Sequence, residues 1–478
     1  MTVSRAELPK ASDQQDEEPS GAPQKVGLIS LGCPKNTVDS EVMLGQLERQ
    51  GFEITSDLDQ ASTVIVNTCG FIDEAKEESV ETILEVAEAK GEGRVRKLFV
   101  AGCMVNRYAE ELAAEIPEID GFVGLDDLTK VGDLVSLGSS AAPAPSRAHV
   151  VFDDGAERRL VTRSFAYLKV AEGCNNPCTF CAIPVWRGRF RSRSVASLVR
   201  EAQHLEAGGT RELVLLAQDT TRYGEDLGER RTGLQKLIEA LLANTSIPWI
   251  RFMYAYPTTL DEGLLELMGQ EERLVSYLDM PLQHSHPDIL RGMRRGGSAT
   301  TYLRQLEKAR RHAPDVSLRS TFITGFPGET EAHFQHLMDF VREVRFDHLG
   351  AFVFSPEPDI PATQLEERPS RPVAIERRAR LLEAQEGISL ASRRSLVGKT
   401  LDVLVEGVCS ESEHLLEGRH AGQAPEVDGR VLINDGAAPS GTFAQIEISE
   451  AFADDVVGHV VGPLDQPGVV PAAVMGQT

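Results

Sequence analysis

Three cysteines lie within eight residues of one another, at Cys174, Cys178 and Cys181, with Phe180 directly before the last of them. Thiolates spaced this closely, as C-x3-C-x2-C, can share one iron–sulfur cluster. Zinc is the simpler alternative, but a structural zinc site usually has four protein ligands. Because a fourth cysteine is missing, the pattern predicts a cluster with one iron left open to bind a small molecule.

A second set of cysteines, Cys33, Cys69 and Cys103, is spread along the amino-terminal part of the chain. Each follows a short apolar run typical of a buried strand and precedes a helical pattern. Such alternation predicts a doubly wound parallel sheet, whose strands share one edge at their carboxyl ends. One buried cysteine there would be ordinary, whereas three at equivalent positions indicate a second cluster with an open iron. The apolar runs span 26–31, 61–68 and 97–102.

The Cys174–Cys181 loop opens a larger region of strand–helix alternation, which we expect to span 160–392. Six strand–helix units predict a partial (β/α)6 barrel rather than an eightfold one. In barrels of this kind the chemistry lies where the strands end and the loops begin. The apolar runs of the six units span 165–171, 212–216, 249–254, 274–278, 316–323 and 348–354.

The pattern changes again near residue 393, where apolar residues begin to alternate with polar ones at period two. This alternation, with glycine-rich turns between the runs, is typical of a small all-β module, expected at 393–466. Cys409 stands alone inside it, and we interpret it as a packed or merely tolerated cysteine. The four runs span 401–406, 415–419, 430–433 and 443–448.

Three stretches are expected to lie outside the folded domains. Residues 1–24 are polar, acidic and contain proline, which predicts a disordered tail. A Ser-, Ala- and Pro-rich stretch at 139–159 predicts a linker, and 467–478 is expected to form a second tail. The first domain is therefore expected to span 25–138.

Composition limits the class of protein. A chain of 478 residues with 41% hydrophobic residues can form several cores, and its length predicts roughly two to four domains. It contains no run of about 18 apolar residues and no secretory signal at its start, so we expect no membrane partner. Seven cysteines, most of them near strand ends, favour a reducing compartment and a cytoplasmic protein. The formal charge of -24 disfavours a protein that coats nucleic acid and favours a basic partner.

Several segments of the chain resemble the methylthiotransferases of the radical S-adenosylmethionine (SAM) class, in which a C-x3-C-x-aromatic-C loop holds a 4Fe-4S cluster. The resemblance runs from Lys25 to Gly462 and includes a carboxyl-terminal TRAM module. Within the class the chain is most similar to the RimO family. The sister family MiaB has Gly-Cys-Gln-Met-Asn where this chain has GCPKN at 32–36, and Gln-Asn-Val where it has QDT at 218–220. Trp186 departs from the pattern, since smaller residues are expected there. The RimO-like segments are SLGCPKNTVDSE at 30–41, AQDTTRYG at 217–224 and YAYP at 254–257.

The resemblance implies an enzyme that adds a methylthio group to the β-carbon of an aspartate on the twelfth protein of the small ribosomal subunit. It implies two 4Fe-4S clusters, one on the cysteines at 174–181 and an auxiliary one on the second cysteine set. SAM is implied both as the radical source and as the methyl donor. No acid or base in a protein removes hydrogen from an unactivated carbon at neutral pH, so the cofactors carry this chemistry. A further implied partner is an electron donor such as a flavodoxin or ferredoxin.

Other site residues are expected near the carboxyl ends of the barrel strands. Structural alternatives for them are loop packing for Phe180, a tight turn for 325–329 and a structural histidine for His284. For Arg187, which is followed by Arg189, Arg191 and Arg193, the alternative is a solvated charge run. Residues expected to hold SAM are Phe180, Gln218, Arg319, Gly325 and Glu329. Residues expected to contact the substrate are Gln283, His284 and Arg187.

Two other functions are compatible with parts of the pattern. A MiaB-like enzyme, which methylthiolates a modified adenosine in transfer RNA, would carry the same cysteine sets. The segment 396–462 has three Lys or Arg against twelve Asp or Glu, and an acidic module repels phosphates but attracts a basic ribosomal protein. A non-catalytic RNA- or ribosome-binding factor would need closed sites with four ligands, whereas both sets stop at three.

Overall fold

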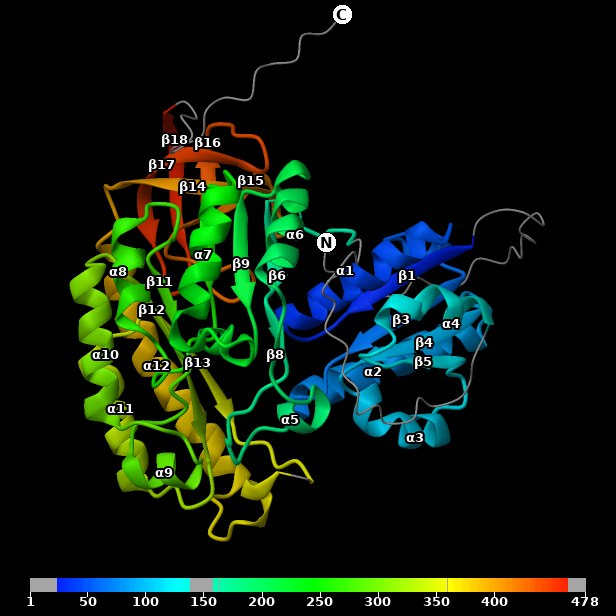
Figure 1. Ribbon diagram of the computed structural model, residues 1–478, viewed down its shortest axis with the longest axis horizontal. Helices are drawn as coiled ribbons and strands as arrows, with labels where there is room; N and C mark the ends of the chain where they lie inside the picture. Colours follow the sequence, from blue (N-terminus) through cyan, green and yellow to red (C-terminus); the bar gives the residue numbers. More distant parts are fainter. Residues whose placement is uncertain (1–23, 138–157, 163, 359, 463–478) are drawn as a thin grey trace, which may run out of the picture. The chain divides into compact units, whose positions relative to one another are not determined.

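The computed structural model describes four stretches of the chain, which form two compact units (Figure 1). The first unit contains the described residues up to Thr162 together with Glu172–Asn175 and Cys181–Arg193, and the remaining residues form the second. The predicted amino-terminal tail, the predicted linker and the predicted carboxyl-terminal tail lie outside the described residues, apart from Gln24, Arg158 and Arg159. The described stretches are 24–137, 158–162, 164–358 and 360–462.

The first unit is built on a five-stranded parallel sheet in the order β2-β1-β3-β4-β5. Three of its strands are those expected from the sequence: β1 (Lys25–Ser30), β3 (Thr63–Thr68) and β4 (Lys97–Gly102). The edge strands β2 (Glu53–Ile54) and β5 (Gly121–Val123) were not expected, because two or three residues are too few to show a pattern.

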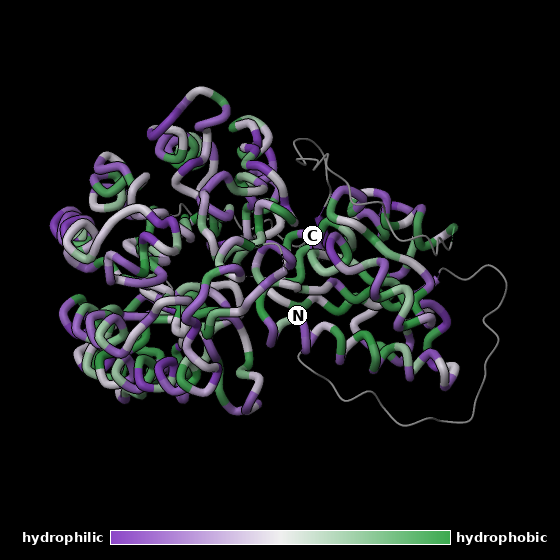
Figure 2. The backbone as a smooth tube through the Cα atoms, turned by 90° about the horizontal axis from the view of Figure 1, so that it is seen from below, coloured by the Kyte–Doolittle hydropathy of each residue, from purple (hydrophilic) through white to green (hydrophobic). Residues whose placement is uncertain are grey.

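Helices cover both faces of this sheet, which confirms the doubly wound fold. Strand residues alternate between two cores: Ile65 and Phe99 pack with α1 and α4, while Val66 and Val100 pack with α2 and α3. Figure 2 shows the hydrophobic stretches that run through these elements. The helices are α1 (Pro34–Arg49), α2 (Asp73–Gly91), α3 (Val105–Glu115) and α4 (Val131–Leu137).

The second unit contains the six parallel strands of the predicted partial barrel. They form two three-stranded sheets, β10-β9-β6 and β11-β12-β13, which a parallel bridge between Ile250 and Leu274 joins. The strands are β6 (Phe165–Lys169), β9 (Glu212–Leu216), β10 (Trp249–Phe252), β11 (Tyr277–Asp279), β12 (Ser317–Thr324) and β13 (His348–Val353). The helices between and after them are α6 (Val195–Ala207), α7 (Gly233–Asn244), α8 (Glu262–Gln270), α9 (Pro287–Gly292), α10 (Ala299–His312), α11 (Glu331–Val344) and α12 (Arg371–Arg394). No helix among the described residues is both long enough and apolar enough to cross a membrane.

The carboxyl-terminal module is a closed five-stranded barrel in the order β14-β15-β16-β18-β17. Val403, Val405, Ile433 and Ile446 are among the residues that fill its interior. Four of the strands were expected, and the fifth, β18, was missed because Gly458 interrupts its apolar run. Cys409 is buried at the end of β14, as its interpretation as a packed residue required. The strands are β14 (Thr400–Cys409), β15 (Ser412–His420), β16 (Val431–Asp435), β17 (Thr442–Ala451) and β18 (Val456–Gly462).

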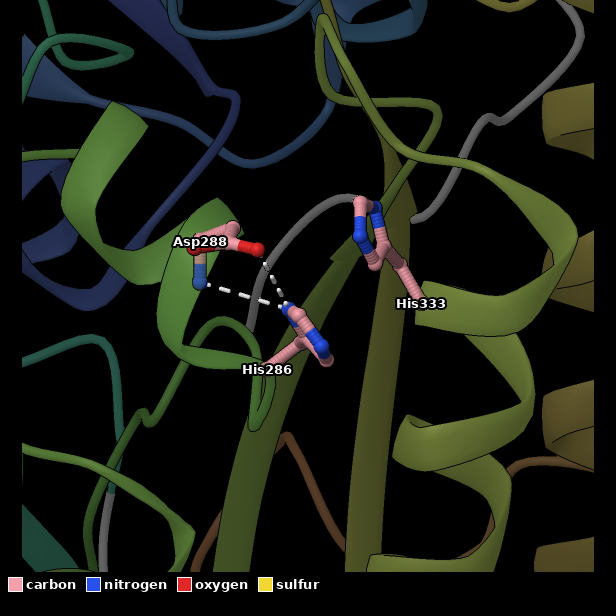
Figure 3. Close-up of side chains that lie close together, drawn as sticks. All are labelled: His286, Asp288 and His333. Carbon is pink, nitrogen blue, oxygen red and sulfur yellow. Dashed lines mark hydrogen bonds and ion pairs between the residues drawn. The ribbon is translucent and has the colours of Figure 1, made fainter.

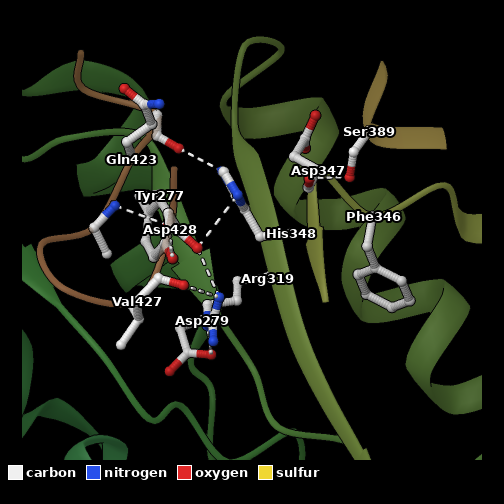
Figure 4. A network of polar contacts seen from close by, with 12 residues as sticks. Tyr277, Asp279, Arg319, Phe346, Asp347, His348, Ser389, Gln423, Val427 and Asp428 are labelled. Carbon is white, nitrogen blue, oxygen red and sulfur yellow. Dashed lines mark hydrogen bonds and ion pairs between the residues drawn. The ribbon is translucent and has the colours of Figure 1, made fainter. Parts of the chain in front are cut away.

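The β-barrel module packs on the amino ends of the large barrel's strands, and Asp428 is the centre of one contact (Figure 4). Its carboxylate, which is fully buried, accepts a hydrogen bond of 2.7 Å from the Tyr277 hydroxyl and lies 2.6 Å from an Arg319 guanidinium nitrogen. His348 approaches it to 3.2 Å. Tyr277 and His348 are the first residues of β11 and β13, so Asp428 ties the module to the barrel end opposite the strand carboxyl ends.

A second buried contact joins the two parts of this unit through Glu212, the first residue of β9. Its carboxylate lies 2.7 Å from Arg251 of β10 and 2.7 Å from Arg419 of β15, and all three side chains are buried. Arg419 also binds Glu406 of β14 at 2.8 Å. Buried charges need such pairing because an unpaired charge inside a protein is strongly destabilising.

Candidate functional site

The auxiliary cysteine set lies at the carboxyl edge of the first unit's sheet. Cys33, Cys69 and Cys103 follow β1, β3 and β4, which are neighbours in the sheet order. Cys33 precedes the first turn of α1, and the other two side chains are buried. The structure therefore brings together three cysteines that are 70 residues apart in the sequence (33 to 103), as the alternation of strands and helices predicted.

These thiols share a buried and mutually repulsive environment. Burial, together with the neighbouring Cys103 and Cys33, raises the pKa of Cys69 to about 12. Burial also raises the pKa of Cys103 to about 11, although the guanidinium of Arg187 opposes this change. A bound cation stabilises thiolates that are crowded in this way, because sulfur binds a metal in its deprotonated form. The donor set thus fits an iron–sulfur cluster.

Gly32 holds the backbone against Cys69 and provides a test of this geometry. Its φ of +92° is in the left-handed region, and a Cβ placed there would lie 2.5 Å from the Cβ and 2.9 Å from the Sγ of Cys69. We expect Gly32→Ala to displace Cys69 and to lower bound iron from about eight to about four atoms per reconstituted chain. Iron and sulfide analysis after anaerobic reconstitution measures this loss.

Gly51 supplies the matched control for that variant. It also has a left-handed φ, +88°, but nothing lies within 4 Å of the point that a Cβ would occupy. Gly51→Ala therefore introduces a similar backbone strain without a collision, and it should retain all the iron. Full iron content in Gly32→Ala would show that Cys69 does not depend on this close approach.

Arg187 does not have the position expected of a substrate contact. Its side chain is 2% exposed, and its guanidinium binds Asp39 at 3.0 Å and Glu172 at 3.1 Å. It also donates hydrogen bonds to the Asn36 side-chain oxygen at 2.8 Å and to the Cys103 sulfur at 3.2 Å. The guanidinium is therefore engaged at the auxiliary cysteines rather than presented to a substrate, which corrects the expectation from the sequence.

The loop that carries the other cysteine set begins after the carboxyl end of β6. The backbone N–H of Cys174 donates to the Gly188 carbonyl at 3.1 Å. Thr179 anchors the middle of the loop, because its N–H donates to the Met293 carbonyl at 3.0 Å and its hydroxyl to the Gly292 carbonyl at 2.8 Å. Cys174 is buried and the other two cysteines are partly exposed, so the loop offers thiols on a fixed backbone.

Arg295 contacts this loop, although it was not among the site residues expected from the sequence. One of its guanidinium nitrogens donates to the Cys178 sulfur at 3.6 Å, and the guanidinium stacks over the Tyr256 ring at 4.3 Å from the centroid. It also binds the Pro281 carbonyl. In the sequence Arg295 stands in the pair Arg294-Arg295, which looks the same as a surface charge pair.

The residues expected to hold SAM fall into two groups. Gln218, directly after β9, and Phe180, in the cysteine loop, are half-buried. Gly325 follows β12 with a φ of +77°, and the Glu329 carboxylate accepts the N–H groups of Gly325 and Phe326. Burial raises the pKa of Glu329 to about 7 against the opposing effect of nearby Arg377. Glu329 therefore stabilises its own turn.

Arg319, the remaining residue expected to hold SAM, has a different partner. It is the third residue of β12, near the amino end of the strand, and it binds Asp428 of the carboxyl-terminal module at 2.6 Å. Asp279 lies 3.8 Å from the same guanidinium. These contacts make Arg319 a link between the barrel and the module, and we do not assign it to SAM.

Gln283 and His284 lie on the loop that follows β11. Gln283 has a φ of +71° and pairs with Phe322 of β12, which fixes the direction of the loop. His284 is fully buried, its Nδ1 accepts the N–H of His286 at 2.9 Å, and burial lowers its pKa to about 3. The imidazole is therefore neutral, and its Nε2 has no hydrogen-bond partner among the residues that the structure describes.

A group of three metal-binding residue types, His286, Asp288 and His333, lies close to this loop (Figure 3). The Nδ1 of His286 accepts the Asp288 N–H at 3.2 Å at the start of α9, and the Nδ1 of His333 accepts the Thr330 N–H at 3.2 Å in the capping box of α11. The two rings lie against one another, tilted by 36°, with centroids 4.2 Å apart. Because the Nδ1 atom of each histidine already accepts a backbone N–H at the start of a helix, we interpret the group as a capping cluster.

Comparison with known families matches the three folded parts of the chain. The model for uncharacterized protein family UPF0004 matches residues 25–124, that for the radical SAM superfamily 168–341, and that for the TRAM domain 397–461. Each match lies inside one of the domains expected from the sequence. The second unit's large barrel from the end of β6 to α11 therefore corresponds to a radical SAM core, and the carboxyl-terminal module to a TRAM domain.

Curated relatives are similar to nearly the whole chain. The ribosomal protein uS12 methylthiotransferase RimO of Solibacter usitatus is 47% identical over 94% of this chain and 97% of its own length. The proteins of the same name from Anaeromyxobacter sp. (strain Fw109-5) and Geobacter sulfurreducens are 46% and 43% identical. They cover 96% and 92% of this chain, and 98% and 100% of their own lengths.

Solved structures share the fold at low sequence identity. The radical SAM methyltransferase TsrM from Kitasatospora setae, with cobalamin and a 4Fe-4S cluster bound, has a TM-score of 0.53 at 15% identity and covers 72% of this chain and 77% of its own. The apo form of the cobalamin-dependent radical enzyme OxsB has a TM-score of 0.51 at 13% identity, and covers 77% of this chain and 56% of its own. At these identities the likeness concerns the fold alone.

Proposed function

Because the chain belongs to the RimO family of ribosomal protein uS12 methylthiotransferases, we propose that it adds a methylthio group to the β-carbon of an aspartate on uS12. The observation that carries this proposal is the 47% identity to a RimO protein over 94% of the chain.

The six cysteines of the two sets are the ligands that we propose for two 4Fe-4S clusters. When bound, the clusters and SAM supply the hydrogen-abstracting radical and the methylthio group. The protein's part is to hold the thiolates, orient the substrate carbon and exclude water from the radical. Buried backbone contacts of the Cys174–Cys181 loop and the buried Cys69 and Cys103 side chains suit this part.

For SAM itself we propose contacts from loops at the carboxyl ends of the barrel strands. Phe180 and Gln218 are half-buried in these loops, and the turn from Gly325 to Glu329 presents backbone that a ligand can approach closely. We assign substrate contact to Gln283 and His284, because the buried Nε2–H of His284 lacks an acceptor among the described residues. His284→Ala should raise the KM for SAM or for uS12 while the melting temperature of the protein stays close to that of wild type.

The electron donor and the compartment also belong to the proposal. We propose a small one-electron carrier, a flavodoxin or ferredoxin, acting in the cytoplasm, where a reducing environment keeps seven cysteines available. Reduced flavodoxin and reduced ferredoxin should each support SAM cleavage without dithionite.

The charge of the TRAM domain supports uS12 rather than transfer RNA as the substrate. Eight of its acidic residues are exposed on the surface. Of its three Lys or Arg residues, Arg419 is buried, Arg430 is paired with Glu411 and Glu417, and Lys399 is exposed. A surface of this kind repels phosphate groups and attracts a basic protein. The eight exposed acids are Asp402, Glu411, Glu413, Glu426, Asp435, Glu447, Glu450 and Asp454.

Salt should therefore weaken the interaction with uS12. We expect the KM for uS12 to rise about tenfold between low salt and roughly 0.5 M salt, with kcat nearly unchanged, because screening acts on exposed charges. Steady-state kinetics at several salt concentrations measure the change. Reversing Glu447, Glu450 and Asp402 to lysine should raise the KM at low salt, and an unchanged KM would rule out recruitment by this surface.

A single reaction mixture distinguishes an enzyme from a non-catalytic binding factor. The reconstituted protein, a reductant, SAM and uS12 are incubated without oxygen, and 5′-deoxyadenosine and the mass of uS12 are measured. We expect deoxyadenosine together with one methylthio group on an aspartate of uS12. Stable clusters with neither product would contradict the proposed function.

A further inference from the structure

Arg187 carries the strongest unassigned feature of the first unit, a buried cation against a cysteine sulfur. It follows the short helix α5 (Ile183–Trp186), and its side chain is among the largest fully buried ones in the described structure. One nitrogen, Nη2, lies 3.2 Å from the sulfur of Cys103. The same nitrogen donates to Asn36 and Asp39, while Nη1 reaches Glu172 at 3.1 Å.

Two carboxylates fix the position of this cation. Asp39 projects from α1 and is 1% exposed, and Glu172 lies two residues before Cys174 and is 12% exposed. Held from both sides, the planar guanidinium has little freedom to turn away from Cys103. The cation therefore has the fixed geometry that a steady hydrogen bond to a ligand sulfur requires.

A hydrogen bond from a cation changes the energy of a cluster ligand. Hydrogen bonds to the sulfurs and the local net charge help to set the reduction potential of an iron–sulfur cluster. A positive charge beside a sulfur stabilises the more negative, reduced form and raises the potential, whereas a nearby carboxylate has the opposite effect.

We propose that Arg187 is a positioning residue of the auxiliary cluster, and that its hydrogen bond to the Cys103 sulfur raises the reduction potential of that cluster. The proposal rests on the assignment of Cys33, Cys69 and Cys103 as cluster ligands. Asp39 and Glu172 hold the guanidinium and partly offset its charge. Glu172, which precedes the Cys174–Cys181 loop, and Arg187, which follows it, thus supply charge to the auxiliary cysteine set.

Because Arg187 and Asp39 carry opposite charges, neutralising each of them should shift the midpoint potential of the auxiliary cluster in opposite directions. The full-length chain with Cys174, Cys178 and Cys181 replaced by alanine carries the auxiliary cluster alone, and its midpoint potential is measured by redox titration followed by electron paramagnetic resonance. Arg187→Gln should shift the midpoint to more negative values, and Arg187→Lys should restore part of the shift. Asp39→Asn should shift it to more positive values.

Two results would overturn the proposal. One is an unchanged midpoint in Arg187→Gln at full iron content, and the other is a shift in the same direction for Arg187→Gln and Asp39→Asn, as a general disturbance of the fold would produce. If Arg187→Gln does not hold iron, the sign of the Asp39→Asn shift alone decides. The titration needs no substrate, so its outcome is independent of whether uS12 is methylthiolated.

Discussion

Alanine in place of Cys33, Cys69 or Cys103 is expected to abolish methylthio transfer to uS12 while reductive cleavage of SAM continues. The structure places these cysteines together on one sheet edge, apart in sequence from the loop at 174–181. Removing one ligand removes the proposed source of the sulfur, but it leaves in place the cysteines at 174–181, the proposed ligands of the cluster that holds SAM. The variants should retain about four iron atoms per chain and still form 5′-deoxyadenosine.

The other cysteine set and the seventh cysteine provide the controls. Cys178→Ala should lose both deoxyadenosine formation and methylthio transfer, because it removes a proposed ligand of the cluster that we propose holds SAM. Cys409 is 4% exposed within the TRAM domain, so Cys409→Ala should keep about eight iron atoms and both activities. A Cys69→Ala variant that still produced methylthiolated uS12 would contradict the division of labour between the sets.

The second large effect is expected on stability, from the buried Asp428. Asp428→Ala removes the ion-pair partner of Arg319 and the acceptor of the Tyr277 hydroxyl. It leaves the largely buried guanidinium with the Val427 carbonyl at 3.2 Å and the Asp279 carboxylate at 3.8 Å. Breaking a buried ion pair of this kind costs about 3–5 kcal/mol. Denaturant unfolding followed by fluorescence should therefore show a large loss, with the TRAM domain separating from the barrel at lower denaturant.

The same residue predicts a pH dependence. Burial opposes ionisation of Asp428, but His348 and Arg319 outweigh it and the pKa is lowered from its usual value. A carboxyl with a lowered pKa stabilises the fold above its unfolded pKa of about 4, and this contribution is lost as the pH falls further. The stability difference between wild type and Asp428→Ala should thus be full at pH 7 and shrink below about pH 4.

Asp402 on β14 is the matched control, since it is an exposed carboxylate in the same domain. Asp402→Ala should change the free energy of unfolding by no more than about 0.5 kcal/mol. Equal effects of the two substitutions would show that the Asp428 contacts contribute no more than surface charge does.

The cysteine sites could be predicted because their signal is local. Cys33, Cys69 and Cys103 each follow a strand, and parallel topology alone brings strand ends together. The resemblance to RimO used segments such as Ala217–Gly224 around the strands, and the curated relatives confirm the family.

Charged residues could not be placed in this way. Arg187, Arg189, Arg191 and Arg193 look equivalent in the sequence, and only packing against Asp39 and Glu172 buries the first of them. Arg319 meets Asp428 across 109 residues of chain, so no local pattern announces the pair. A side chain's partner across domains is a property of the tertiary fold, which periodicity does not contain.

Short elements were missed for a different reason. The strands β2 and β5 have two and three residues, and their backbone hydrogen bonds depend on a neighbouring strand rather than on their own composition. The six strands of the barrel and three of the first unit were found because buried parallel strands form apolar runs, and even the three-residue β11 overlaps such a run at 274–278.

The central claim is that this chain methylthiolates uS12, and a competition measures it directly. Reconstituted wild-type protein is given SAM, a reductant, free uS12 and transfer RNA in one anaerobic mixture, and both macromolecules are then analysed by mass spectrometry. We expect a methylthio group on one aspartate of uS12 and none on the RNA. A methylthio group on the transfer RNA alone would contradict the account.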